Sequence, residues 1–305
     1  IRRQRQMCIR DRHINYNVKR AVQLGIPVEK ALQMATIQPA RCYGLYQLGM
    51  IAPGRQADFV ILDNVTDLNV VDVYHCGKKI IKDEKAEVKP CPPHLKNTVH
   101  VSGFSEERLK LKHSGEKAHV IQMLEKQIVT KDVVEDVPWV ETDGERYFTS
   151  NEEYQKIAVI ERHKNTGKMG VGIVKGYGIH GGAIASSVSH DSHNIIVVGD
   201  NDHDMALAVK EMIRTQGGYT LVCNGEIYGT LPLPVMGLMS DAGYESVNEA
   251  LARMIPKAHE MGVKDGFDPF ITLSFMALPV IPEIRITPRG IYLVNEDRML
   301  RTPFS

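Results

Sequence analysis

The stretch that decides the fold is residues 160–209, which read IERHKNTGKMGVGIVKGYGIHGGAIASSVSHDSHNIIVVGDNDHDMALAV. Short runs rich in β-branched residues, bounded by glycine, asparagine or charged residues, are typical of β-strands. Such runs cover residues 156–161, 170–174 and 194–198. A helix is predicted over residues 202–216, with Asn201 or Asp202 as its N-cap. This alternation predicts a compact domain of the α/β or α+β class from about residue 150 onward.

The residues after this stretch continue the same pattern. They predict strands at 219–223 and 226–229, a helix from Ser240–Asp241 through Glu260, an apolar segment at 270–280 and a closing strand at 290–294. The apolar spacing within the long helix supports its assignment. The polar, mixed residues from 97 to 150 predict no clear element.

The N-terminal ninety residues have a different character. They predict two short amphipathic helices at 17–24 and 28–36, one more helical turn at 39–45, a strand at 57–63 and a hairpin formed by 70–74 and 79–82. Pro27 suits a helix start. Gly49 and Gly54 allow turns with positive φ. Three prolines between residues 89 and 96 indicate a linker.

The composition fits a globular protein and argues against several partners. Of the 305 residues, 43% are hydrophobic, and 37 basic residues balance 37 acidic ones. A net charge of zero argues against nucleic acid as the main partner. No window offers 18 uninterrupted apolar residues, so no membrane span is expected. The five cysteines lack a CxxC pair, and scattered free thiols suit the cytoplasm.

The first twelve residues, IRRQRQMCIRDR, are basic and lack the apolar run of a secretory signal. A solvated arm and an amphipathic targeting segment are both open. We favour a third interpretation, because MCIRDR resembles a translated sequencing adapter. We therefore expect residues 1–12 to be non-native, and the chain, which starts abruptly in a helical pattern, to be a fragment.

Histidines are the first hint of a functional site, because five of the twelve fall within about forty residues. The motif HDSHN places two imidazoles, a carboxylate, a hydroxyl and an amide directly before a buried strand, where α/β proteins tend to bind ligands. The catalytic candidates are His190, Asp191 and His193. Asp191 can orient one imidazole. A polar network that braces the loop, a contact to substrate, and direct metal ligation all remain open.

Further polar residues are candidates for substrate-binding or supporting roles. They are Ser192 and Asn194 of the same motif, Glu161, Arg162 and His163 at the end of the preceding strand, and His180 beside a glycine run. The run Gly176–Gly181 has the GxGxxG spacing, but no helix is predicted directly after it, so its placement does not fit a dinucleotide site. The segment GDNDHD lacks the twelve-residue pattern of an EF-hand, so we interpret it as a helix cap.

Residues 31–63, ALQMATIQPARCYGLYQLGMIAPGRQADFVILD, resemble the end of a chain of the amidohydrolase superfamily. The matching positions include Pro39-Ala40, Pro53-Gly54 and Ala57-Asp58. In that superfamily a metal-binding (β/α)8 barrel is followed by a short helix and a small β-sandwich built from both termini. The resemblance implies that this chain carries the last barrel helices and part of the sandwich.

The block from 160 to 209 resembles the C-terminal domain peculiar to adenine deaminases. Glu161-Arg162-His163, Gly182-Ala183-Ile184-Ala185 and His190-Asp191-Ser192-His193-Asn194 carry the resemblance. Later segments agree, namely Leu231-Pro232-Leu233-Pro234, Gly237-Leu238-Met239-Ser240 and Asp268-Pro269-Phe270. The resemblance covers nearly everything after His13, with a looser match from 97 to 150.

The resemblance implies hydrolysis of adenine to hypoxanthine and ammonia, with a binuclear Mn²⁺ or Fe²⁺ centre in the barrel and a homodimer as the complete enzyme. A barrel needs about 250 residues, so its ligands are expected outside this chain. We expect the fragment alone to bind no catalytic metal and to be inactive. Another amidohydrolase, or a non-catalytic purine-binding domain, are the alternatives.

The predicted division of the chain follows from these resemblances. It comprises a non-native segment (1–12), the last barrel helices (13–45), a partial β-sandwich (46–88), a linker and irregular segment (89–130) and the adenine deaminase C-terminal domain (131–305).

Overall fold

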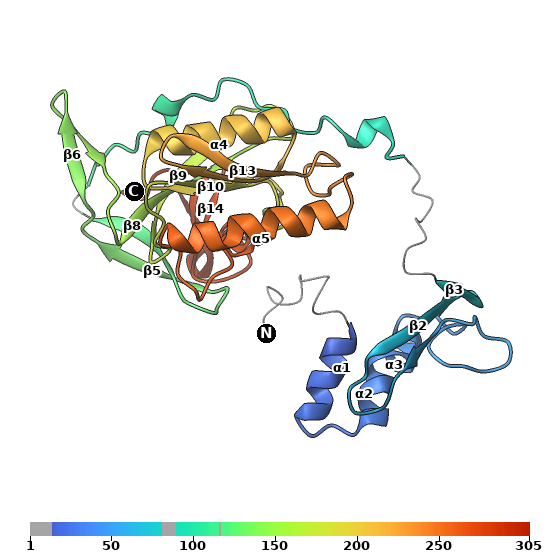
Figure 1. Ribbon diagram of the computed structural model, residues 1–305. Coiled ribbons are helices and arrows are strands. Elements are labelled where there is room, and N and C mark those ends of the chain that lie inside the picture. The colour runs from blue at the N-terminus through green and yellow to red at the C-terminus, as the bar shows by residue number, and fades with distance from the viewer. Residues whose placement is uncertain (1–13, 81–89, 116) are drawn as a thin grey trace. The chain divides into compact units, whose positions relative to one another are not determined.

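The computed structural model describes residues 14–80, 90–115 and 117–305. The chain forms two compact units, Ile1–Pro90 and Cys91–Ser305, shown in Figure 1. The predicted non-native segment 1–12 and the end of the predicted hairpin, Ile81-Lys82, lie outside the described residues. No described helix is both long and apolar enough to cross a membrane.

The smaller unit begins with three short helices, as the sequence predicts. They are α1 (Ile14–Gln23), α2 (Val28–Ala35) and α3 (Ile37–Cys42). Val18, Ala31 and Leu68 form its small buried core. Gly49 has a φ of 88°, and a Cβ there would lie 2.8 Å from that of Ala40. The predicted need for glycine at this turn is therefore confirmed.

A three-stranded antiparallel sheet completes this unit. Its strands are β1 (Phe59–Leu62), β2 (Val70–His75) and β3 (Lys78–Ile80), in the order β1-β2-β3. His75 pairs with Lys78, so Cys76 and Gly77 form a two-residue turn with positive φ values of 49° and 77°. The predicted strand and hairpin are confirmed. None of the residues of these three strands is fully buried.

The larger unit is built on an eight-stranded sheet. Its order is β13-β12-β10-β11-β8-β9-β4-β5, and every neighbouring pair is antiparallel except β4 with β9. The strands are β4 (Ala118–Met123), β5 (Thr130–Glu135), β8 (Tyr154–Ile160), β9 (Met169–Lys175), β10 (Gly182–Ser186), β11 (Ile195–Gly199), β12 (Gly218–Cys223) and β13 (Glu226–Pro232).

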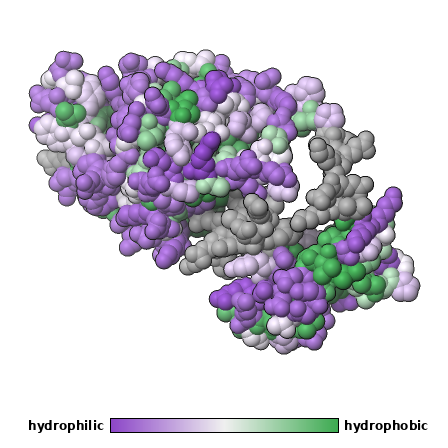
Figure 2. All heavy atoms as spheres, in the orientation of Figure 1, coloured by the Kyte–Doolittle hydropathy of each residue, from purple (hydrophilic) through white to green (hydrophobic). Residues whose placement is uncertain are grey.

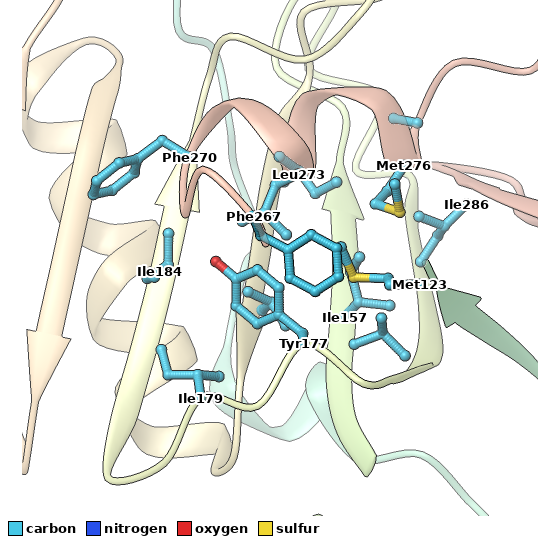
Figure 3. Packing of buried hydrophobic residues seen from close by; sticks show 14 of the residues in the cluster. Met123, Ile157, Tyr177, Ile179, Ile184, Phe267, Phe270, Leu273, Met276 and Ile286 are labelled. Carbon is cyan, nitrogen blue, oxygen red and sulfur yellow. The ribbon is translucent and has the colours of Figure 1, made fainter. Parts of the chain in front are cut away.

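Helices cover both faces of this sheet, as Figure 1 shows for α4 and α5. On one face α4 (Asp202–Thr215) packs against β10, β11 and β12. On the other lie α5 (Tyr244–Glu260) and α6 (Ile271–Met276). Every residue of β8, β10 and β11 is therefore buried. Figure 3 shows part of the second face, where Phe270 and Leu273 belong to one buried cluster with Ile184 and Ile157 of the sheet.

Smaller elements complete this unit, and one of them, a second sheet, packs against β9 on the face that also carries α5 and α6. They are a sheet of β14 (Ile284–Thr287), β15 (Gly290–Leu293) and β16 (Arg298–Leu300), a hairpin of β6 (Trp139–Thr142) and β7 (Glu145–Phe148), and the 3-10 turns η2 (Pro93–Leu95), η3 (Glu106–Leu109) and η4 (Val294–Glu296). The mixed class predicted from the sequence is confirmed, in its antiparallel α+β form.

Two sequence expectations are wrong in detail. The segment 89–130 is not irregular throughout, because β4 lies within it and pairs along its whole length with β5. The mixed polar sequence of this segment did not predict β4, which is largely buried because it lies between β9 and β5. The long helix begins at Tyr244 after Gly243, and not at Ser240-Asp241. Asp241 instead forms an ion pair with Lys96. The finer division of the chain stays a prediction.

Candidate functional site

The predicted site residues gather mainly at one end of the eight-stranded sheet. Ile160 at the end of β8 pairs with Ile195 at the start of β11, and Ser186 at the end of β10 pairs with Ile196. The motifs that follow β8 and precede β11 therefore meet at this edge, which we call the histidine end. Glu161-Arg162-His163 and the whole HDSHN motif lie there.

Glu161 organises the loop that leaves β8. Its carboxylate accepts hydrogen bonds from the backbone N–H groups of His163 (2.6 Å), Lys164 (2.8 Å) and Thr166 (2.9 Å), and from the Thr166 hydroxyl (2.8 Å). Partial burial acts to raise the pKa of Glu161, but these donors outweigh it and lower the pKa to about 2. The carboxylate is an ionised loop brace.

Arg162 lies at the centre of the histidine end. It is 1% exposed. Its guanidinium donates to three backbone carbonyls, those of Thr98 (3.1 Å), Met236 (2.9 Å) and His193. Burial lowers the pKa of Arg162 to about 10, opposed by the nearby charge of Glu161. These three hydrogen bonds tie Arg162 into the protein and brace the histidine end, and a contact of Arg162 with substrate stays a prediction.

The Met236 loop approaches Arg162 closely. Gly237 has a φ of 70°, and a Cβ there would lie 2.8 Å from the guanidinium carbon of Arg162. The carbonyl of Gly237 also accepts a hydrogen bond of 2.6 Å from the Ser187 hydroxyl. Only glycine fits both the backbone conformation and the space. The GLMS and ERH segments thus meet although 74 positions separate Arg162 from Met236.

His190 lies on the outer side of this network. Its side chain is 35% exposed, and its ring stacks on Phe275 of α6, with centroids 5.0 Å apart. Its Nδ1 lies 3.5 Å from the Asp191 carboxylate, which is 83% exposed. The backbone N–H of His190 donates to the carbonyl of Ser274 at 2.9 Å. Asp191 is therefore close enough to orient the His190 ring, as predicted, although its carboxylate is exposed to solvent.

His193 is the more deeply set histidine. Its ring lies 6.2 Å from that of His190, centroid to centroid. Burial, then the positive charges of His190 and Arg162, lower the pKa of His193. Its Nδ1 and the nearby Ser189 hydroxyl are buried without a hydrogen-bond partner among the described residues. An unsatisfied buried polar atom costs free energy, so each is available to a bound polar group.

Ser192 and Asn194, the remaining residues of the motif, contact residues that follow β8. The ring of His163 hydrogen-bonds the Ser192 carbonyl at 2.6 Å, and Asn194 accepts from the Arg162 N–H at 3.3 Å. Ser192 is exposed and Asn194 is buried. These contacts tie the end of β8 to the start of β11. The Ser192 carbonyl and the Asn194 amide oxygen are thus engaged within the protein, and the catalytic roles of His190, Asp191 and His193 stay predictions.

His180 is separated from this group. It lies between the end of β9 and the start of β10, whose Ala183 pairs with Gly199 at the far end of β11. That end also holds the start of α4, where Asn201 is the N-cap and accepts from the Asp204 N–H at 2.8 Å. The loop before β10 and the loop after it lie at opposite ends of that strand, so His180 and His190 are far apart although they are close in sequence.

The opposite end also contains a cavity of about 330 Å³. Lys156 lines it, almost fully buried in an ion pair with Asp202. Burial lowers the pKa of Lys156. The interpretation of GDNDHD as a helix cap is confirmed by the contact of Asn201.

The described residues do not fit a two-metal centre. Within residues 14–80, 90–115 and 117–305, only Asp58, His75 and Cys76 bring three ligand-type atoms within 4.8 Å of one another. All three are exposed, and two bridged metals need a larger set of histidines and carboxylates. The described histidines of the larger unit form no such group, so the geometry does not support direct metal ligation by HDSHN.

Several residues at the histidine end were not found from the sequence. Ser189 directly precedes the motif, and its position beside His190 is the signal that could have identified it. Thr98, Met236 and Phe275 come from distant segments whose spacing carries no signal. Only the folded sheet brings their backbone carbonyls or rings to Arg162 and His190.

Comparison with known proteins places this architecture. Residues 127–298, more than half the chain, match the adenine deaminase C-terminal domain, and residues 2–90 match the amidohydrolase family. A protein of Desulfitobacterium hafniense (strain Y51), named adenine deaminase, is 50% identical over 292 residues, which cover 96% of this chain and 51% of that protein.

Two further relatives carry the same name. Those of Nitratidesulfovibrio vulgaris (strain DP4) and Petrotoga mobilis are 42% and 40% identical, each covering 94% of this chain and 50% of its relative. The chain thus spans about half the length of these curated relatives. It belongs to the adenine deaminase C-terminal domain family and carries, ahead of that domain, a segment of the metal-dependent amidohydrolase family.

Proposed function

We propose that the protein to which these 305 residues belong is an adenine deaminase, which hydrolyses adenine to hypoxanthine and ammonia. The observation that carries this proposal is the 40–50% identity to proteins of that name across nearly the whole chain. In the reaction water adds at C6 of the purine, and the amino group leaves as ammonia. The partner is therefore a small molecule.

Manganese or iron is the metal of this proposal. A metal ion supplies water of lowered pKa near neutral pH. Because the described residues do not fit such a centre, no step of the hydrolysis is assigned to them. The proposal includes the expectation that these 305 residues on their own do not turn over adenine. The cytoplasm is the proposed compartment, supported by four free cysteines among the described residues. A homodimer is the proposed assembly.

We assign the histidine end a supporting role in substrate binding. His190 presents a half-exposed ring stacked on Phe275, and His193 Nδ1 lacks a partner in the described structure. An aromatic face beside an unpaired ring nitrogen suits a purine, which stacks and also offers hydrogen-bonding edges. Arg162 donates to the His193 carbonyl, while the Phe275 ring and the Ser274 carbonyl contact His190, so both residues are held in place.

A chimera tests the proposal. Residues 14–305 replace the matching half of the Desulfitobacterium hafniense relative, and the purified, manganese- or iron-loaded protein is assayed for ammonia release from adenine. We expect activity in the chimera and none in the 305-residue chain. A folded, metal-loaded chimera that leaves adenine unchanged, beside an active parent, would overturn the proposal. Light scattering on the same sample tests the homodimer.

Variants of the chimera test the histidine end. We expect His190→Ala and His193→Asn each to lower kcat/KM by about tenfold or more, as for loss of a positioned polar contact. His180→Ala is the matched control, because this exposed histidine lies at the opposite end of the sheet. Equal effects of all three changes would remove the histidine end from the reaction.

A further inference from the structure

The tip of the β2–β3 hairpin in the smaller unit is held in one conformation by the segment before β1. The carboxylate of Asp58 accepts a hydrogen bond of 2.7 Å from the backbone N–H of Cys76. The backbone N–H of Gly77 donates to the Ala57 carbonyl at 2.9 Å. Gln56 donates to the other oxygen of Asp58 at 2.6 Å. The turn and its side chains are therefore preorganised, although they face solvent.

Three side chains at this tip form a continuous relay. Nδ1 of His75 lies 3.1 Å from the Asp58 carboxylate, and Nε2 of the same ring lies 3.6 Å from the thiol of Cys76. A thiol, an imidazole and a carboxylate in this order are the arrangement that activates a nucleophile. Cys76 is exposed in the two-residue turn, so dissolved reagents can reach its sulfur.

The geometry favours a relay over a metal site. One imidazole gives a metal ion only one nitrogen, and here the two nitrogens face different partners. With Nδ1 against Asp58, only Nε2 and the thiol of Cys76 remain, and two ligands fall short of the three or four protein ligands of a zinc site.

We propose that Cys76 is a reactive thiol that exchanges with small disulfides, with His75 as its base and Asp58 as the positioning residue. His75 Nε2 accepts the thiol proton while the sulfur attacks one sulfur of the disulfide RSSR. The S–S bond of RSSR breaks, and a Cys76–S–S–R bond forms. The leaving RS⁻ takes the proton from His75. Cys76 is oxidised and the leaving sulfur is reduced, so the disulfide is the only oxidant needed.

The chain itself supplies a matched control, because Cys42 is also exposed and belongs to the same unit. The intact 305-residue protein is treated with oxidised glutathione in the presence of EDTA. Unreacted thiols are blocked with N-ethylmaleimide, and each cysteine is followed by peptide mass spectrometry. We expect Cys76 to react at least about tenfold faster than Cys42, the scale of a general-base contribution.

Two variants separate the relay from simple exposure. His75→Asn should bring the rate at Cys76 down to that of Cys42 and leave Cys42 unchanged. Asp58→Asn should slow Cys76 by a smaller factor, and Asp58→Glu should recover part of it. Equal rates at the two cysteines in the unaltered protein would overturn the proposal, as would a rate at Cys76 that His75→Asn does not change. Neither result bears on adenine deamination.

Discussion

β1 of the smaller unit and β11 of the larger unit have nearly the same chemistry and opposite environments. β1 reads FVIL, with Val60 51% exposed and Ile61 43% exposed, whereas every residue of β11, IIVVG, is buried. β11 has strands on both sides and helices over both faces, and β1 has a partner strand on one side only among the described residues. An apolar run therefore specifies a strand, and the neighbouring layers decide its burial.

The surface shows the same difference. Figure 2 shows a large hydrophobic area on the smaller unit and a mostly hydrophilic visible face on the larger one. The exposed apolar side chains of the three-stranded sheet are Val60, Ile61, Val70, Val71, Val73 and Ile80. Contiguous apolar surface of this kind marks an interface.

The largest expected effect comes from placing a carboxylate in each sheet. Val197→Asp in β11 buries a charge without a partner, because Val197 is fully buried, and should cost more than about 4 kcal/mol. Val71→Asp in β2 replaces a side chain that is 59% exposed and should change stability by less than about 0.5 kcal/mol. Urea denaturation of each protein measures both. Similar losses at the two sites would erase the distinction between the units.

A smaller loss is expected where the larger unit requires glycine. Gly237→Ala should cost about 3 kcal/mol, because the new methyl group meets the Arg162 guanidinium in a left-handed backbone conformation. Gly144→Ala is the control: its φ is 77° and nothing lies within 4 Å of the added atom, so about 1 kcal/mol is expected. Thermal unfolding compares them. Equal losses of stability in the two variants would mean that the Arg162 guanidinium moves aside at no cost in free energy.

Glu161→Gln tests, through the pH dependence of stability, whether a charged loop brace contributes to the larger unit. The folded pKa of Glu161 is about 2, below its ordinary value of 4.5, so its stabilisation is present above pH 4.5 and is lost as pH falls towards 2. After allowance for solvent screening, the variant should lose about 1–2 kcal/mol at pH 7. The difference from the unaltered protein should shrink in acid. If the stability difference between the two proteins stays constant from pH 7 to pH 3, the loss comes from changed packing or hydrogen-bond geometry and not from the lost charge.

The smallest effect is expected at His193. Its folded pKa lies below the ordinary 6.5, so the unfolded chain binds the proton first and the fold loses stability as pH falls below 6.5. His193→Asn keeps a residue that tolerates the left-handed conformation, φ 50°, but cannot titrate. From pH 8 to pH 5 the unaltered protein should therefore lose more stability than the variant, as measured by urea denaturation at each pH. Parallel pH profiles would show that His193 is not buried in its neutral form.

The sequence by itself determined the local elements and the family. β-branched runs predicted β8, β9 and β11, Asn201 was one of two predicted caps of α4, and the HDSHN and ERH motifs indicated the adenine deaminase relationship. These signals are local, since strand propensity, capping and motif spacing depend on residues a few positions apart.

Only the tertiary structure decided which of these residues share a site. Because β10 and β11 are antiparallel, His180 lies at one end of these strands and His190 lies at the opposite end. The tertiary structure also brought the carbonyls of Thr98 and Met236 to Arg162, where they accept hydrogen bonds from its guanidinium. Local sequence carries no information on contacts between distant segments, because the pairing of strands and the stacking of layers create them.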